Sequence, residues 1–266
     1  MENKNNIQDI QDEQQQDDKD SSNRHANKLV RLIKSIELNP ERGKSIDNRI
    51  IQYKYYNSFN YSLLSRNQDD VTLTLGVTSS KPRDGKTLVA CNLAVSLALG
   101  FQKKTVLVDL NIHNPRLHQI FDVVQSPGLV EAFTDGQIHV SETAIEHLSI
   151  LSSGNLVWHP ENYKEAQAFS YFSTHFINNH SLGLDHLPAF RDVIYSLEQE
   201  FEIVIVDLPA VTTQEVPVLF MNQLQGLVVV IQSGKTKRED LDIMFQHINE
   251  HQVLGFVFNR AKEEQI

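Results

Sequence analysis

The sequence is poor in cysteine, in positive charge and in long apolar runs, and each shortage excludes a class of protein. The single cysteine, Cys91, cannot form a disulfide within the chain, which agrees with a reducing compartment. No run of about 18 or more apolar residues occurs, so we expect no segment that spans a bilayer. The formal charge of −10 leaves no basic excess to neutralise phosphates, so nucleic acid is not expected as a partner.

The first residues are polar and acidic, whereas a secretory signal would be basic and then apolar. We therefore expect a cytoplasmic protein. Residues 1–26 are rich in Gln, Asp, Asn and Ser and contain few large apolar side chains that could offset the entropy of ordering. This composition predicts a disordered acidic tail.

A helical segment is expected over residues 27–66. Between Asn27 and Leu38, apolar residues recur at helical spacing with basic residues on the other side, which predicts a short basic amphipathic helix. This helix docks either on the main domain or on a membrane surface or partner, and the second alternative would recruit the protein to the inner face of the plasma membrane. A second helix is expected around Asn48–Leu64.

Over residues 67–266, apolar strands alternate with helices. Strands that are apolar throughout and separated by helices indicate a parallel sheet covered on both faces. The predicted fold class is therefore α/β, with a doubly wound, mostly parallel sheet. The expected strands are residues 71–79, 104–110, 148–153, 202–208, 226–232 and 253–259, and the expected helices are residues 87–99, 187–201 and 239–251.

Residues 155–188 fit this alternation poorly, because they mix His, Asn, Ser and aromatic residues with only a weak helical pattern. We expect a divergent insertion here. The segment contains His159, His175, His180 and His186, but none has a second ligand at the close spacing of a metal site. Scattered surface histidines are the expected explanation.

The stretch SSKPRDGKT, residues 79–87, lies between the first expected strand and its helix. A loop at this place presents backbone N–H groups and the positive end of the helix dipole to phosphates. In the pattern GxxxxGK[ST], the Lys reaches the β- and γ-phosphates and the hydroxyl ligates Mg²⁺. Gly85, Lys86 and Thr87 fill the last three positions, whereas Ser80 replaces the first Gly. A plain strand–helix turn is the alternative, but the flanking elements favour a P-loop that binds ATP with Mg²⁺.

Two expected strands end in an acidic residue, Asp109 and Asp207. Ligands of open α/β sheets bind beyond the carboxyl ends of the parallel strands. A carboxylate there can hold Mg²⁺ through its water shell or orient an attacking nucleophile. The alternative role is that of a strand cap, but the P-loop in the same sheet favours a role in the site.

These motifs occur in an order that resembles the ATPase domain of bacterial tyrosine kinases. VTSS, KPxxGKT, VLVDLNIHNPRLHQIF and PGLVEAF are followed by a strand ending in Gly154, then by IVIVDLPAV, VVVIQSGKTKREDL and VLGFVFNR. These kinases are cytoplasmic autokinases of capsule and exopolysaccharide synthesis, related to division-site and chromosome-partitioning ATPases with deviant Walker A loops. The resemblance covers about residues 45–262, and the ordered set is more specific than any single motif.

The resemblance implies a P-loop NTPase with a Walker A loop at Gly85–Thr87, a Walker A′ motif from Asp109 and a Walker B motif ending in Asp207. It also implies an adenine contact near Asn259. The residues expected to bind the nucleotide are Ser80, Lys81, Pro82, Arg83, Asp84, Gly85, Lys86, Thr87, Leu88 and Asn259; those expected to be catalytic are Lys86, Asp109 and Asp207; and those expected to hold the metal are Thr87, Asp109 and Asp207.

The loop departs from the family pattern, which usually reads PGEGK. Arg83 replaces a glycine that gives the loop its conformational freedom, and its side chain either adds positive charge near the phosphates or points to solvent. Lys81 stands where the deviant-loop ATPases have a lysine that reaches across a dimer. An exposed loop lysine is the equally plain alternative.

The family's presumed general base is missing, because the Walker A′ motif is Asp109-Leu110-Asn111 instead of DxD. The neutral amide of Asn111 cannot take a proton from a tyrosine hydroxyl as a carboxylate can. Phosphoryl transfer is therefore expected to be slow or absent unless Asp109 substitutes. No tyrosine follows Tyr195, so phosphorylation of a tyrosine-rich C-terminal tail is not expected either.

Four tyrosines, Tyr53, Tyr55, Tyr56 and Tyr61, crowd into a segment where the family has a helix with an ExxRxxR motif for ring assembly. That motif is not present, which puts the octameric ring of the family in doubt. The tyrosines either pack against the domain or a neighbouring subunit, or form a relocated phosphorylation cluster.

Three functional hypotheses follow. The leading one is an ATP-binding ATPase or tyrosine kinase with weakened catalysis, which couples its nucleotide state to a membrane polysaccharide co-polymerase, a chain-length regulator. The second is a nucleotide-switched scaffold or positioning ATPase without kinase activity. The third is an adaptor that binds no nucleotide. Assembly into a homo-oligomer is left open.

Overall fold

The computed structural model of the chain describes residues 56–66, 72–155, 182–213, 216 and 218–261. The expected tail, the expected basic amphipathic helix and residues 156–181 of the expected insertion lie outside the described residues. The strands are β1 Leu73–Ser79, β2 Thr105–Asp109, β3 Ser141–Glu142, β4 Leu148–Leu151, β5 Ile203–Asp207, β6 Gly226–Gln232 and β7 Val253–Asn259. The α-helices are α2 Asn57–Arg66, α3 Lys86–Val95, α4 Leu117–Phe121, α5 Leu129–Asp135, α7 Leu187–Glu200, α8 Val218–Met221 and α9 Arg238–Phe245.

The strands form one seven-stranded sheet in the order β3-β4-β2-β5-β1-β6-β7. All neighbouring pairs are parallel except β3 with β4, which is antiparallel. The chain leaves β1, crosses to β2 on the far side of β5, and later returns to place β5 between them. The prediction of a doubly wound, mostly parallel sheet is confirmed.

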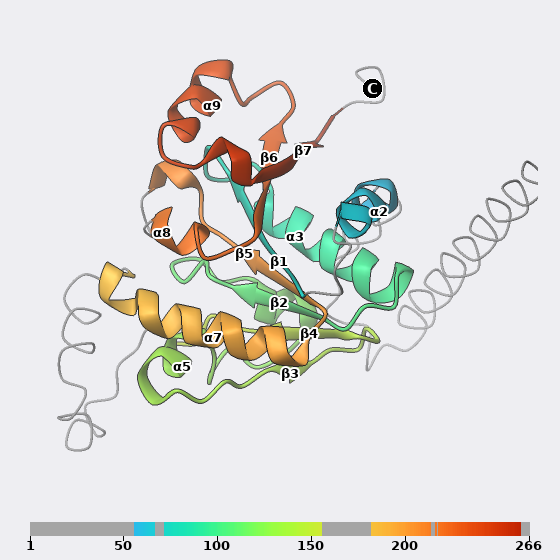
Figure 1. The fold of residues 1–266 in the computed structure, drawn as a ribbon, viewed down its shortest axis with the longest axis vertical. Helices are drawn as coiled ribbons and strands as arrows, with labels where there is room; N and C mark the ends of the chain where they lie inside the picture. Colours follow the sequence, from blue (N-terminus) through green and yellow to red (C-terminus); the bar gives the residue numbers. More distant parts are fainter. Residues whose placement is uncertain (1–55, 67–71, 156–181, 214–215, 217, 262–266) are drawn as a thin grey trace, which may run out of the picture.

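Helices cover both faces of the sheet (Figure 1). One face packs α2, α3 and α4 against the strands, and the other packs α5, α7, α8 and α9. The central strands β1, β2, β5 and β6 are buried along their whole length, which explains why their sequences are apolar without alternation. No helix in the described part of the chain is long and apolar enough to cross a membrane.

One expected helix changes from α to π geometry within its predicted range, and another ends earlier than its sequence pattern predicted. The helix that begins at the P-loop ends at Val95 and continues as a wider π turn, Ser96–Gly100, where the Ser96 hydroxyl donates to Asn57 Oδ1 of α2 at 2.8 Å. Helix α9 ends at Phe245 instead of extending to residue 251. Past it, Asn249 Oδ1 accepts the N–H of His251 at 3.0 Å and caps a separate short 3-10 turn.

His186 contradicts the prediction of scattered surface histidines. Its side chain is buried at the start of α7, where Nδ1 accepts the N–H of Gly183 at 3.2 Å and lies 3.1 Å from Asp185 Oδ1. The ring of Phe133 packs 6.2 Å from it, centroid to centroid. Local turn geometry, which composition does not reveal, therefore places this imidazole in the core. The other three histidines of the predicted insertion lie outside the described residues.

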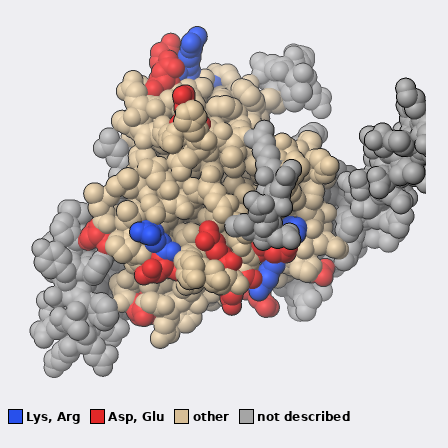
Figure 2. All heavy atoms as spheres, in the orientation of Figure 1, with Lys and Arg blue, Asp and Glu red and all other residues tan. Residues whose placement is uncertain are grey.

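The surface of α7 is polar, as its amphipathic sequence predicts. Figure 2 shows charged side chains of both signs over α7 and at the end of the molecule formed by α9, with a mostly uncharged area between them. The buried side of α7 carries Phe190, Val193 and Leu197. The helix thus packs its apolar side against the core and exposes its charged side chains to solvent.

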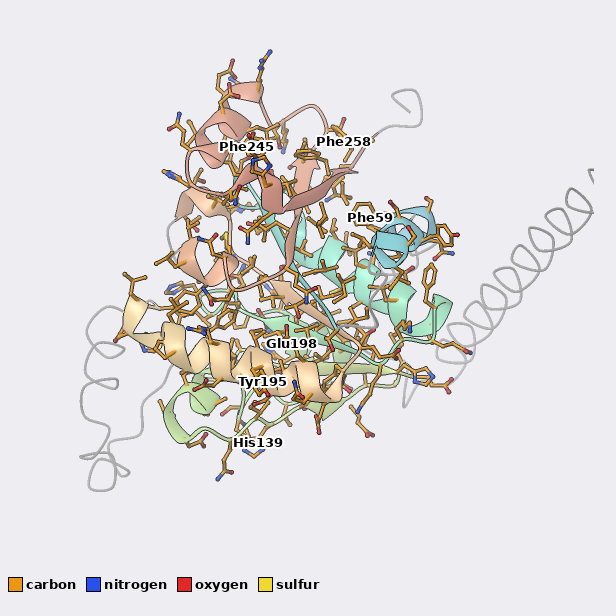
Figure 3. All side chains as sticks on the ribbon, viewed as in Figure 1. Phe59, His139, Tyr195, Glu198, Phe245 and Phe258 are labelled. Atoms are coloured by element: carbon orange, nitrogen blue, oxygen red, sulfur yellow. The ribbon has the colours of Figure 1, made fainter. Side chains whose placement is uncertain are left out.

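Replacing Phe190 by Ala tests the packing of this layer. Phe190 is fully buried, and its ring centroid lies 5.0 Å from that of Phe220. Phe190→Ala should lower the free energy of unfolding by about 3–5 kcal/mol, because it removes apolar contact and leaves a cavity. The control is Tyr195→Ala on the exposed side of α7 (Figure 3), which should change it by less than about 0.5 kcal/mol. Equal effects of the two changes in urea unfolding would contradict the placement of α7.

Candidate functional site

The carboxyl ends of β1, β5 and β2 meet at one edge of the sheet, and the candidate site lies there. Val77 of β1 and Asp109 of β2 both stand opposite Asp207 in the strand register. The P-loop, residues 80–85, leaves β1 at the same edge. The strand order thus brings together Lys86, Thr87, Asp109 and Asp207, which are far apart in the sequence.

Helix α3 begins directly at the end of the P-loop. Gly85 is its N-cap residue with φ 97°, in the left-handed region that side chains other than glycine disfavour. A Cβ at this position would also collide with the side-chain amide of Asn259. The N–H of Val89 then bonds to the Gly85 carbonyl at 3.0 Å and starts the helix, so that its first N–H groups face the loop.

Thr87 and Asp207 join the P-loop to the neighbouring strand. The Thr87 hydroxyl donates to Asp207 Oδ2 at 2.7 Å. The other oxygen, Asp207 Oδ1, is buried and has no hydrogen-bond partner among the described residues. A buried carboxylate oxygen without a partner is costly, and it fits a cation or a metal-bound water at this place. Lys86 is also buried and lies close enough to lower the pKa of the Asp207 carboxyl.

Both strand-end carboxyl groups have raised pKa values. Burial, and secondly the nearby Asp109 carboxylate, raise the pKa of Asp207 to about 7, although the Thr87 hydrogen bond and the Lys86 ammonium both lower it. Burial likewise raises the pKa of Asp109 to about 6, against the hydrogen bonds from three backbone N–H groups. Near neutral pH the negative charge of this carboxyl pair is therefore poorly compensated, and a divalent cation would supply the missing positive charge.

Asp109 has a role that the sequence did not predict. Its Oδ1 accepts the N–H of Asn111 at 3.2 Å, and its Oδ2 accepts the N–H groups of Arg116 and Leu117 at 3.0 and 3.1 Å. The carboxylate therefore fixes the loop between β2 and α4 and caps the start of α4. Asn111 is held in this loop through its own backbone.

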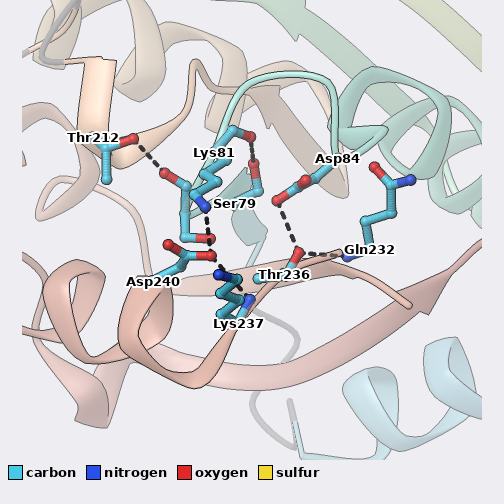
Figure 4. Close-up of polar contacts among 9 residues, drawn as sticks. Ser79, Lys81, Asp84, Thr212, Gln232, Thr236, Lys237 and Asp240 are labelled. Carbon is cyan, nitrogen blue, oxygen red and sulfur yellow. Dashed lines mark hydrogen bonds and ion pairs between the residues drawn. The ribbon is translucent and has the colours of Figure 1, made fainter. Parts of the chain in front are cut away.

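The segment that follows β6 supports the P-loop from one side (Figure 4). Thr236 Oγ1 donates to Asp84 Oδ2 at 3.3 Å and accepts the N–H of Gln232 at 2.9 Å. Lys81 Nζ lies 2.6 Å from Asp240 Oδ2 in the first turn of α9. The side chain of Lys81 is thus half exposed and forms an ion pair within its own chain. The sequence suggested either a lysine that reaches across a dimer or a plain exposed lysine, and neither alternative included this ion pair.

Two further hydrogen bonds hold the P-loop backbone. Thr212 Oγ1 donates to the Ser80 carbonyl at 2.5 Å, and Asn259 Nδ2 donates to the Asp84 carbonyl at 2.8 Å. Asn259 was expected to contact adenine. The structure places its amide on the loop itself, and the adenine contact stays a prediction. Thr212 carried no signal in the sequence, because a single loop hydroxyl belongs to no motif.

Arg83 adopts φ 70°, a left-handed conformation, while its side chain is exposed. An L-residue other than Asn or Asp is strained there by roughly 1–2 kcal/mol. This backbone strain occurs at the position where the loop pattern of the bacterial tyrosine kinases, PGEGK, has glycine. Of the other expected loop residues, Pro82 is exposed and Leu88 is half-buried. Within the described ranges, no group of three or more His, Cys, Asp or Glu side chains forms a metal cluster.

Comparison with known proteins points to one kind of enzyme. Tyrosine-protein kinase YwqD of Bacillus subtilis is 25% identical over 213 residues, covering 76% of this chain and 81% of the kinase. Tyrosine-protein kinase CpsD of Streptococcus agalactiae is 22% identical over 233 residues, covering 82% and 88%. No family model matches the chain.

Solved structures share the fold. The kinase domain of the Escherichia coli tyrosine kinase ETK superposes with a TM-score of 0.59 at 17% identity, covering 79% of this chain and 77% of that domain. The septum site-determining protein MinD of Pyrococcus horikoshii, solved with Mg-ADP, gives a TM-score of 0.50 at 20% identity, covering 73% and 74%. The prediction of a P-loop α/β fold is thereby confirmed.

Arg83→Gly should stabilise the protein, because glycine adopts the left-handed backbone without strain. The expected gain in the free energy of unfolding is about 0.5–1 kcal/mol, after the greater freedom of the unfolded chain is subtracted. Arg83→Ala is the matched control, since it removes the charge and keeps the Cβ. If alanine stabilises as much as glycine in urea unfolding, backbone strain is not the cause.

Asp207→Asn tests the raised pKa of the buried pair. A carboxyl whose pKa is higher in the folded state stabilises the fold below its unfolded pKa, near 4, and this contribution is lost as the pH rises toward 7. In the absence of nucleotide, the neutral amide should therefore raise the free energy of unfolding on the order of 2 kcal/mol at about pH 8, and much less at about pH 4. Asp242→Asn, at an exposed site on α9, is the matched control for replacing a carboxylate by an amide and should change the free energy of unfolding by less than about 0.5 kcal/mol. A gain for Asp207→Asn that does not change with pH would contradict the assignment.

Proposed function

We propose that this chain, a relative of the bacterial tyrosine kinases, binds ATP with Mg²⁺ at the P-loop edge and transfers the γ-phosphoryl group to tyrosine. The observation that carries this proposal is the junction of Thr87 with Asp207 beside the buried Lys86. It unites a P-loop hydroxyl, a strand-end carboxylate and an ammonium group in one place. Those are the three groups that a metal-bound triphosphate needs.

Each residue has a proposed task. Lys86 neutralises the β- and γ-phosphates, and the N–H groups of the loop and of the first turn of α3 bind phosphate oxygens. Thr87 and Asp207 would hold Mg²⁺, with the Thr87 hydroxyl and Asp207 Oδ1 as the available oxygen atoms. When bound, the metal withdraws negative charge from the phosphates. The remaining expected loop residues, Ser80 to Asp84 and Leu88, shape the cradle.

Asp109 and Asn259 position other parts of the site. Asp109 orders the loop that carries Asn111, and it supports Mg²⁺ through Asp207 and the water shell instead of acting as the base. Asn259 ties the P-loop to the end of β7 through its hydrogen bond to the Asp84 carbonyl. The proposed adenine contact lies at the same end of β7. This division of tasks leaves the transfer step without a carboxylate base at position 111.

The cellular role proposed here is regulation of capsule or exopolysaccharide assembly from the cytoplasm, next to a membrane polysaccharide co-polymerase. The support comes from relatives, which include the succinoglycan biosynthesis transport protein ExoP of Rhizobium meliloti at 24% identity over 197 residues, covering 72% of this chain and 23% of that protein. Nucleotide binding would order the loops around the P-loop, and α9 would transmit the change to the surface through Lys81 and Asp240.

A nucleotide-switched scaffold without kinase activity is the second candidate, and the amide at Asn111 favours it. Incubation of the protein with ATP and Mg²⁺, followed by assays for free phosphate and for phosphotyrosine, separates the two. Phosphotyrosine supports the kinase. Free phosphate without phosphotyrosine supports the scaffold.

Lys86→Met should weaken ATP binding at least about tenfold, because a charge-assisted contact to phosphate contributes roughly 1.5–3 kcal/mol. Isothermal titration calorimetry measures the change. Lys103→Met serves as control, since Lys103 pairs with Glu202 on the surface at the opposite edge of the sheet. Unchanged affinity in Lys86→Met would sink the assignment of the P-loop.

Asn111→Asp should increase the rate of tyrosine phosphorylation by about tenfold or more, because it restores a carboxylate to the Walker A′ loop. ATP affinity should stay within a few fold, which separates an effect on transfer from one on binding. Asn114→Asp, at an exposed position in the same loop, is the matched control for added charge. If both variants leave the rate unchanged, the missing base is not what limits transfer.

A further inference from the structure

Helix α2 presents Tyr61 to solvent, whereas Tyr56, directly before the helix, is partly buried. Of the seven tyrosines of the chain, four stand between residues 53 and 61, and Tyr56 and Tyr61 are the two of them that the structure describes. Tyr56 packs against the core beneath α2, and burial raises the pKa of its phenol to about 12. The side chain of Tyr61 is 66% exposed. Packing against the domain thus explains Tyr56 but not Tyr61, and packing of Tyr61 against a neighbouring subunit stays a prediction.

Tyr61 projects from a helix that is fixed to the domain. Asn57 Oδ1 accepts the Ser96 hydroxyl at 2.8 Å, and Leu63 is buried. Phe59, marked on α2 in Figure 3, lies against Gly255 of β7 so closely that a side chain there would collide with its ring. The exposure of Tyr61 is therefore a feature of an anchored helix.

The charges around Tyr61 suit a phosphate better than those around the comparably exposed Tyr195. On a helix, residues three and four positions apart are neighbours. Tyr195, 64% exposed and marked with Glu198 in Figure 3, has Arg191, Asp192, Glu198 and Gln199 at these positions. The two carboxylates outweigh the single guanidinium, so the net charge of −1 there would repel an incoming triphosphate and the phosphorylated product. The corresponding positions around Tyr61, residues 57, 58, 64 and 65, are Asn, Ser, Leu and Ser. No carboxylate opposes phosphorylation from these positions.

Both anchors of α2 lie far from the P-loop of the same chain, which favours a phosphate donor bound to another copy. Helix α2 is anchored at Ser96, ten residues after Lys86 and thus about 15 Å along α3 from the P-loop. Its second anchor, Gly255, precedes Asn259 by four residues of β7, which is about 13 Å from the place where Asn259 touches the P-loop. An outward-facing tyrosine on α2 does not reach across this distance to its own nucleotide.

We infer that Tyr61 is the phosphoryl acceptor of this protein, and that it is modified in trans by ATP bound at the P-loop of a second copy. The inference rests on the proposed kinase function. The Tyr61 phenol oxygen forms a bond to the γ-phosphorus, the bond from that phosphorus to the β–γ bridging oxygen breaks, and ADP leaves. The phenol proton passes to solvent, so that tyrosine and ATP yield phosphotyrosine, ADP and one proton.

The test incubates the full chain with ATP and Mg²⁺ and maps phosphate by tandem mass spectrometry, which separates Tyr55, Tyr56 and Tyr61 within the tryptic peptide of residues 55–66. Tyr61→Phe removes only an exposed hydroxyl and should reduce total phosphotyrosine at least about tenfold, if one site accepts most of the phosphate. Tyr195→Phe should leave it unchanged. A Lys86→Met copy should gain phosphate on Tyr61 only when wild-type protein is added.

The outcomes separate this inference from the proposed function. Phosphate on Tyr61, lost in Tyr61→Phe and transferred to the Lys86→Met copy, supports both. Phosphotyrosine at residues 53 or 55 or at Tyr195, with none at Tyr61, overturns the inference and leaves the kinase function standing. Phosphate on Tyr61 at a rate per molecule that does not rise with protein concentration overturns transfer in trans. Complete absence of phosphotyrosine, with ATP binding intact, overturns both.

Discussion

Two buried carboxyl groups, Asp109 and Asp207, stand side by side at the ends of neighbouring strands, and the rest of the site is arranged around them. Like charges in a buried place repel, so the pair needs hydrogen-bond donors, a proton or a cation. Asp109 is supplied with three backbone N–H groups. Asp207 has one hydroxyl and a nearby ammonium, and one of its oxygens has no hydrogen-bond partner in the described part of the chain. This asymmetry favours Asp207 over Asp109 as the residue that would contact the proposed Mg²⁺.

The same constraint links the site to the rest of the fold. Thr87 can reach Asp207 only because β5 lies next to β1, and β5 holds that place because the chain crosses over it to form β2. The opposite side of the P-loop is held by Asp240 of α9 and by Thr236 in the segment before that helix. A change of charge at the phosphates would therefore alter the ion pair between Lys81 and Asp240 and so affect the exposed helix α9. This is the physical route by which nucleotide state could alter a partner surface.

Sequence patterns predicted most of the fold, because buried parallel strands are continuous apolar runs. The order of the motifs indicated a family resemblance, which the similarity to the tyrosine-protein kinases confirms. Lys86, Thr87, Asp109 and Asp207 could be predicted to converge, because strand ends in a parallel sheet share one edge. The contacts of Thr212 and Asp240 with the P-loop could not be predicted from the sequence, since they depend on how the loops pack. His186 was wrongly expected at the surface for the same reason. The early end of α9 was also not predicted, because the separate turn that Asn249 caps beyond it depends on a local hydrogen bond that helical periodicity does not reveal.

The central claim is that the site at the P-loop binds ATP and its metal next to a carboxyl pair that holds a proton near neutral pH. The most direct measurement is a calorimetric titration of ATP with Mg²⁺ into the wild-type protein at about pH 6.5, in two buffers of different ionisation enthalpy. The account predicts saturable binding of one nucleotide per chain, dependent on Mg²⁺ and accompanied by release of a proton to the buffer. Absence of binding, or binding that neither needs Mg²⁺ nor releases a proton, would contradict it.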